Sequence, residues 1–206
     1  MKSTKKNLIL TVLLLSLLLS VVALDPVSVS AKVTMPAKSS VLVKNTANYI
    51  TKCMAQSPKK SWTKLKMNNK TCFDAISYIC DQCDHKDIFK SEGQLHTYCY
   101  DYFGRTGYKN VTTGGYFYKQ GNRVVLSDFC KGDWGESWPE CKITKKKKVK
   151  SGIYDVYVTC YFRTDAGLLE PGENPLRKEG DCVIRIKKNS KSRFGYVVTG
   201  IKYKSA

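Results

Sequence analysis

The sequence predicts an α+β fold in which three N-terminal helices pack on a curved antiparallel β-meander. Two observations predict it. Helical spacing of apolar residues is confined to the first half of the chain, whereas a period of two runs through the last third, Gly152 to Lys204. Turn sequences separate the alternating stretches. Helices followed by strands are typical of an α+β domain.

The three helices are expected at defined starting points. The first spans Ala37–Gln56, the second opens at Thr71 with Asp74 completing a capping box, and the third opens near Ser91 and ends at Gly104. Their apolar residues repeat at helical spacing, namely Val43, Ala47, Ile50 and Met54, then Phe73, Ile76, Ile79, Cys80 and Cys83, then Leu95, Tyr98, Cys99, Tyr102 and Phe103.

Strands are expected from there to the C-terminus. A hairpin covers Tyr116–Leu126 and turns at Gln120-Gly121-Asn122. A later strand runs into Lys145–Lys148 and turns at Ser151-Gly152 into the meander. Near its end, Gly200 interrupts the alternation as a β-bulge would.

The central hairpin of the meander has a predicted register. Symmetry about Pro171 places Cys160 opposite Cys182 on the apolar face. The same register gives the further pairs Val158–Ile184, Val156–Ile186, Tyr157–Arg185 and Asp155–Lys187. Apolar, cationic and cysteine pairings are then satisfied together.

The N-terminus has the pattern of a secretory signal peptide. Lysines precede an apolar run from Leu8 to Ala23, and Val29-Ser30-Ala31 offers a cleavage site, with cleavage after Ala23 as the second choice. Residues 1–31 are therefore expected to be removed, leaving one domain over residues 32–206 and no transmembrane anchor. Loss of three lysines and one aspartate takes the net charge from +18 to +16.

This charge favours an anionic partner, such as a cell envelope or another polyanion, although solubility alone could explain it. We expect a secreted, basic, non-catalytic binding module, with the oligomeric state left open. One alternative is a secreted hydrolase acting on a polyanion such as RNA, with His85 and His96 sharing acid and base work. Another is a cationic toxin or antimicrobial protein. No catalytic, cofactor-binding or metal-binding residue is assigned, and no cofactor is expected.

Nine cysteines in an exported domain favour disulfides, and the odd number leaves at least one unpaired within the chain. The candidate pairs are Cys160 with Cys182 and Cys130 with Cys141. For Cys80, Cys83, His96 and Cys99 a zinc site is the alternative, although an oxidising compartment favours a disulfide between the two helices.

One loop is a candidate ligand-binding segment. It is bracketed by two cysteines and is the only acidic and aromatic stretch in a basic chain, with Trp134, Trp138, Asp133 and Glu136 as candidates. Such residues could stack on a sugar ring, bind a basic partner or cap the end of the sheet. The run Lys145–Lys148 is interpreted as a solvated turn rather than a nucleic-acid site, because no aromatic residues interleave it.

The stretch Val183–Thr199, with its Ile-Arg-Ile-Lys-Lys and Phe-Gly-Tyr-Val-Val segments, carries a resemblance. It resembles the tails of small, uncharacterised secreted proteins of Gram-positive anaerobes with a nuclear-transport-factor-2-like domain. That resemblance implies helices followed by a curved sheet that forms a cone. It covers the last third of the chain and the order of elements, and it transfers no functional residue.

Overall fold

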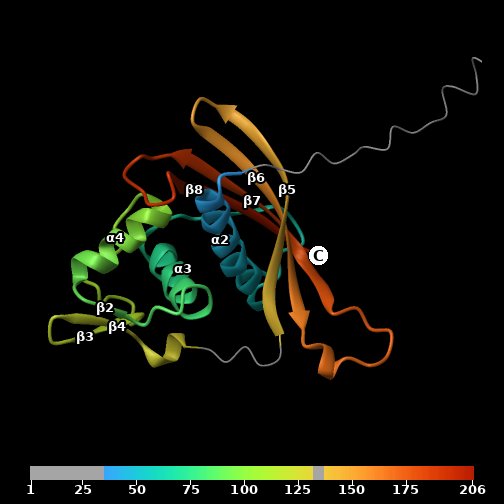
Figure 1. Ribbon diagram of the computed structural model, residues 1–206, viewed down its shortest axis with the longest axis horizontal. Coiled ribbons are helices and arrows are strands. Elements are labelled where there is room, and N and C mark those ends of the chain that lie inside the picture. Colours follow the sequence, from blue (N-terminus) through green and yellow to red (C-terminus); the bar gives the residue numbers. More distant parts are fainter. Residues whose placement is uncertain (1–34, 132–136) are drawn as a thin grey trace, which may run out of the picture. The chain divides into compact units, whose positions relative to one another are not determined.

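A computed structural model of the protein describes residues 35–131 and 137–206, which lie in one compact unit. The described residues form three α-helices and a five-stranded antiparallel sheet, four of whose strands follow the helices while one lies between the first two, and a separate three-stranded antiparallel sheet accompanies the helices (Figure 1). The α+β class is thereby confirmed. The predicted signal peptide lies outside the described residues. None of the described helices is long and apolar enough to cross a membrane.

The helices begin and end close to their predicted positions. They are α2 (Ala37–Gln56), α3 (Asn69–Gln82) and α4 (Glu92–Phe103). The predicted start of α3 at Thr71 was wrong, because Asn68 caps this helix: its side-chain oxygen accepts a 2.9 Å hydrogen bond from the Thr71 N–H. Helix α4 is capped by Ser91 and closes at Gly104, whose φ is +64°.

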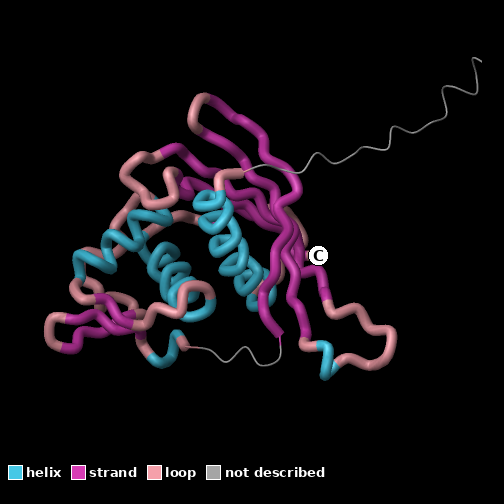
Figure 2. The backbone as a smooth tube through the Cα atoms, in the orientation of Figure 1, coloured by secondary structure: helices cyan, strands magenta, loops and turns pink. Residues whose placement is uncertain are grey.

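The strands form two sheets that are distinct in the backbone trace (Figure 2). The larger sheet has the order β1-β8-β7-β6-β5, and the smaller has the order β2-β4-β3. The strands are β1 (Thr63–Leu65), β2 (Ile88–Phe89), β3 (Phe117–Gln120), β4 (Arg123–Leu126), β5 (Ser137–Lys150), β6 (Ile153–Thr164), β7 (Leu176–Lys188) and β8 (Tyr196–Ser205). Short 3-10 turns cover Asp128–Cys130 and Ala166–Leu168. The predicted small hairpin is thus β3–β4, in the smaller sheet.

Helix α2 contacts β5, β6, β7 and β8 and covers one face of the larger sheet, which we call the inner face (Figure 1). Every second residue of β6 and β7 is buried there: Val156, Val158, Cys160, Cys182, Ile184 and Ile186. Their partners from α2 include Leu42, Val43 and Ile50, all fully buried. The predicted alternation is confirmed, and burial of this face is a main source of stability.

The register of the central hairpin differs from the prediction by two residues. Cys160 lies opposite Gly180, not opposite Cys182, whose partner on β6 is Val158. The hairpin is not symmetric about Pro171, since its pair nearest the loop is Arg163 with Leu176, and a β-bulge interrupts the pairing between Cys160 and Tyr161. Gly180 lies beside this bulge with a φ of +156°, and a Cβ built on it would lie 2.2 Å from the Lys204 carbonyl oxygen of β8. No side chain fits where β7 approaches β8 so closely, so glycine takes the place opposite Cys160.

This register changes the polar pairs on the other face. Asp155 lies opposite Arg185 rather than Lys187, and the guanidinium donates to both carboxylate oxygens at 2.7 and 2.9 Å. The hydrogen bond from Arg185 holds the pKa of Asp155 below its ordinary value. Tyr157 lies opposite Val183 rather than Arg185. The predicted bulge near Gly200 is present, since the β7–β8 register shifts at that point.

The close approach at Gly180 yields a stability prediction. Gly180→Ala should lower the free energy of unfolding by roughly 3 kcal/mol, because a methyl group would meet backbone atoms of β8. Gly121→Ala is the matched control: its φ is also positive, at +60°, but nothing lies within 4 Å of its Cβ position. We expect about 1 kcal/mol there. Urea denaturation of both variants measures the difference, and equal losses would contradict the role of Gly180.

Candidate anion-binding site

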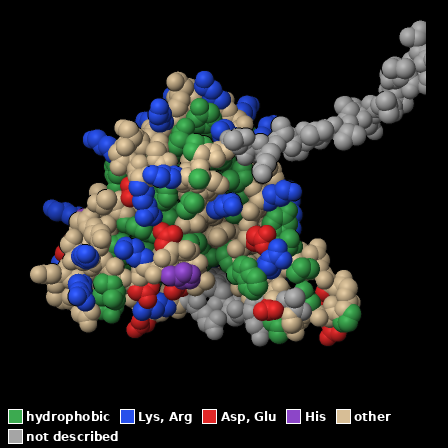
Figure 3. Space-filling view, in the orientation of Figure 1, with side chains coloured by type: hydrophobic (Ala, Val, Ile, Leu, Met, Phe, Trp, Pro, Cys, Tyr) green, Lys and Arg blue, Asp and Glu red, His purple; other side chains and the backbone are tan. Residues whose placement is uncertain are grey.

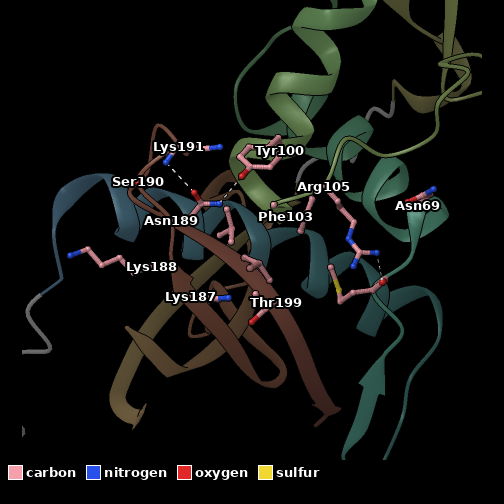
Figure 4. A pocket seen from close by; sticks show the side chains of 14 residues that line it. Asn69, Tyr100, Phe103, Arg105, Lys187, Lys188, Asn189, Ser190, Lys191 and Thr199 are labelled. Carbon is pink, nitrogen blue, oxygen red and sulfur yellow. Dashed lines mark hydrogen bonds between the residues drawn. The ribbon is translucent and has the colours of Figure 1, made fainter. Parts of the chain in front are cut away.

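A pocket of about 650 Å³ lies where the β7–β8 turn meets the end of α4 and the start of α3 (Figure 4). Three separate segments of the chain line it. The lining residues are Met67 and Asn69, Tyr100, Phe103, Gly104 and Arg105, and Lys187, Lys188, Asn189, Ser190, Lys191, Val197, Val198 and Thr199. A smaller hollow lined by Asn68, Asn69, Lys70, Arg105 and Tyr108 adjoins it. We call the two together the basic groove, because Asn69 and Arg105 line both.

The charged side chains of the basic groove are all cationic. Arg105, Lys187, Lys188 and Lys191 line the larger pocket, and Lys70 lines the smaller. The described lining contains no aspartate, glutamate or histidine. Asparagine, serine and threonine side chains supply further hydrogen-bonding groups. An anion entering here therefore meets positive charge and polar groups without a competing carboxylate.

Two helix ends meet at the basic groove, and their partial charges oppose one another. Asn69 is the first residue of α3, where the helix dipole is positive, whereas Gly104 follows the negative end of α4. The helix dipoles therefore do not decide the sign of the potential. The lysine and arginine side chains do.

The β7–β8 turn is held firmly against α4. Asn189 donates to the Tyr100 hydroxyl at 3.2 Å, and the Ser192 hydroxyl donates to the Asp101 carbonyl at 2.7 Å. The Arg193 N–H donates to the Asp101 side chain at 2.9 Å. Three hydrogen bonds between segments about ninety positions apart thus fix the residues that present Lys187, Lys188 and Lys191.

Arg193 anchors the same turn from its other side. Its guanidinium lies 4.7 Å from the ring centroid of Tyr98 and 4.6 Å from that of Phe194. It also donates to Asp84 at 3.2 Å, and Asp84 accepts from the Tyr98 hydroxyl as well. Burial raises the pKa of Tyr98, so the phenol stays protonated as a donor. Arg193 therefore holds the fold, and the groove cations remain available for a ligand.

The cationic groups of the groove differ in how strongly they are held. Arg105 donates through one nitrogen to the Met67 carbonyl at 2.8 Å, which fixes the guanidinium and leaves other N–H groups open. Among the described residues, no carboxylate makes a salt bridge with Lys187, Lys188 or Lys191. Lysine and arginine side chains are spread over the visible face (Figure 3).

None of the described residues of the predicted tryptophan loop lines this groove. Trp134, Asp133 and Glu136 lie outside the described residues. Trp138 lies near the start of β5, opposite Arg163, and is 46% exposed. The loop therefore stays a prediction.

All nine cysteines carry free thiols in this structure. Cys130 contacts the Tyr116 carbonyl and Cys141 contacts the Lys44 carbonyl, so these two thiols point to different surroundings. The Cys160 and Cys182 sulfurs lie 3.8 Å apart, beyond the ~2.05 Å of a disulfide. The hydrogen bond with Cys160, together with burial, raises the pKa of Cys182.

The residues of the zinc alternative do not form a metal site. Over residues 35–131 and 137–206, no group of three or more histidine, cysteine, aspartate or glutamate side chains is arranged to hold a metal ion. Instead, the His96 ring contacts the Tyr108 carbonyl at 3.1 Å. Cys80 and Cys99 are buried in the core. Neither His96 nor His85 lines the basic groove.

Comparison with protein-family models, with curated proteins and with solved structures found no match to this chain. The function is therefore argued from the site alone.

Proposed function

We propose that this protein is an exported, non-catalytic module that binds an anionic polymer, such as a polymer of a cell envelope, in the basic groove. The observation that carries the proposal is the composition of the groove. Arg105, Lys187, Lys188 and Lys191 converge on one pocket whose described lining has no carboxylate. A chain with a net charge of +18 also attracts polyanions over a distance, which raises the rate of encounter.

The geometry of the groove suits a polymer better than a small metabolite. The larger pocket continues into the hollow beside Lys70, so repeating anionic groups could be held along one path. Export follows from the signal-peptide pattern of residues 1–31. The order of helices and sheet, with α2 across the inner face, supports the nuclear-transport-factor-2-like architecture as part of the same proposal.

The role of the groove in binding can be tested by comparing a groove variant with a control variant that loses the same number of positive charges elsewhere. Replacing Arg105, Lys187, Lys188 and Lys191 by glutamine should weaken binding to heparin and to inorganic polyphosphate by roughly tenfold or more at low salt. The control replaces four exposed cations elsewhere, namely Lys44, Lys59, Lys90 and Arg123. Fluorescence anisotropy over a range of salt concentrations measures both. Equal losses in the two variants would show that net charge, and not the groove, binds the polymer.

Export also makes a disulfide part of the proposal. In an oxidising compartment the Cys160 and Cys182 thiols, 3.8 Å apart, would lose two protons and two electrons to an oxidant such as a thiol–disulfide oxidoreductase and form one S–S bond. Peptide mapping without reduction should recover these two cysteines joined. Recovery of Cys160 joined to Cys141, its direct neighbour on β5, would contradict this pairing.

A further inference from the structure

The face of the larger sheet that is turned away from α2, which we call the outer face, is open and chemically distinctive. Its residues alternate with the buried ones and are exposed or half-buried. The strand register places them in rows across the sheet. One row is Lys145, Tyr157, Val183, Lys202 and Lys64, and the next is Lys147, Asp155, Arg185 and Gly200.

Positive charge dominates the outer face. Its carboxylates are already engaged, Asp155 by Arg185 and Asp181 by Lys178 at 2.7 Å, and Glu140 by Arg163. Its other lysines make no salt bridge to any described carboxylate: Lys64, Lys142, Lys145, Lys147, Lys187, Lys202 and Lys204. Lys187 also lines the basic groove, so the two cationic surfaces adjoin.

Aromatic rings lie among these lysines. Tyr157 is half-buried between Lys145 and Val183 in its row, and the Lys145 ammonium lies 5.9 Å from the centroid of its ring. Tyr161 lies four residues further along β6 on the same face, about 13 Å away by strand geometry, opposite Glu140 of β5 and Lys178 of β7. The sequence interpretation of Lys145–Lys148 missed this arrangement. The run lies within β5, and the interleaving aromatic residue comes from the neighbouring strand rather than from the run itself.

We propose that the outer face binds single-stranded nucleic acid, with lysines at the phosphates and with bases stacked on Tyr157 and Tyr161. The inference goes beyond the proposed function, since it assigns a second surface and a defined class of polymer. Basic surfaces interleaved with aromatic rings hold unpaired bases in this way, since every base has a π face. A polyanion without rings would use the lysines but gain nothing from the tyrosines. A duplex would hide its bases from them.

The lysine part of the proposal has a control on the same strand. Lys145 and Lys147 lie on the outer face, opposite Tyr157 and Asp155, whereas Lys146 and Lys148 have the opposite parity. Lys145→Gln/Lys147→Gln should reduce the salt dependence of binding to a fluorescent single-stranded oligothymidylate by about 0.7 in log–log slope per lost phosphate contact. Lys146→Gln/Lys148→Gln removes equal charge and should change the slope less. Equal changes would overturn the assignment to this face.

The tyrosine part separates nucleic acid from other polyanions. Tyr157→Leu should weaken oligothymidylate binding about fivefold or more and leave binding to inorganic polyphosphate unchanged, because only stacking is lost. Tyr157→Trp should retain oligothymidylate binding, and circular dichroism checks that both variants fold. No loss, or equal loss on both polymers, would overturn the nucleic-acid proposal. The groove proposal would survive that result, since the groove variant tests it separately with polyphosphate.

Discussion

Contact between α2 and the inner face decides which side chains the larger sheet presents to solvent. Leu42, Val43 and Ile50 of α2 are buried, as are Val156 and Val158 of β6, and each such side chain contributes roughly 1.5–3 kcal/mol. Because side chains alternate along a strand, burying one parity leaves the other outside. A slip by one residue would bring aspartates and arginines under the helix. The cationic outer face is thus a direct consequence of the apolar inner one.

A slip by two residues is different, and it explains the main error of the sequence prediction. It exchanges one apolar pair for another and leaves both faces intact, so hydrophobic alternation cannot detect it. The observed register comes from an asymmetric loop and a β-bulge between Cys160 and Tyr161, beside Gly180, whose close approach to the Lys204 carbonyl is a contact between strands that the local pattern does not contain. The helices were easier to predict, since caps such as Ser91 and Gly104 act within a few residues. At α3 the prediction placed the helix start at Thr71, whereas the N-cap residue is Asn68.

The candidate site was harder to predict than the fold, because it depends on contacts between segments that are far apart in the sequence. Lys187 and Lys191 lie close together in the sequence, but nothing nearby indicated that Arg105 would join them. That meeting depends on the turn folding back on α4 through Asp101, across some ninety residues. The sequence prediction selected the tryptophan loop instead, because its acidic and aromatic residues are unusual in a basic chain. Cationic and aromatic residues interleave on the outer face only after the strands pair.

Such a concentration of lysines has an energetic cost that constrains how the surface can work. On the outer face, Arg185, Lys178 and Arg163 are paired with carboxylates, but the remaining lysines on neighbouring strands repel one another at low ionic strength. Added salt screens this repulsion and should favour the folded state, yet it weakens attachment to a polyanion. A bound polymer relieves the repulsion directly and so stabilises the fold. The fold tolerates this repulsion because its stability comes from apolar burial on the inner face. Salt does not screen that contribution.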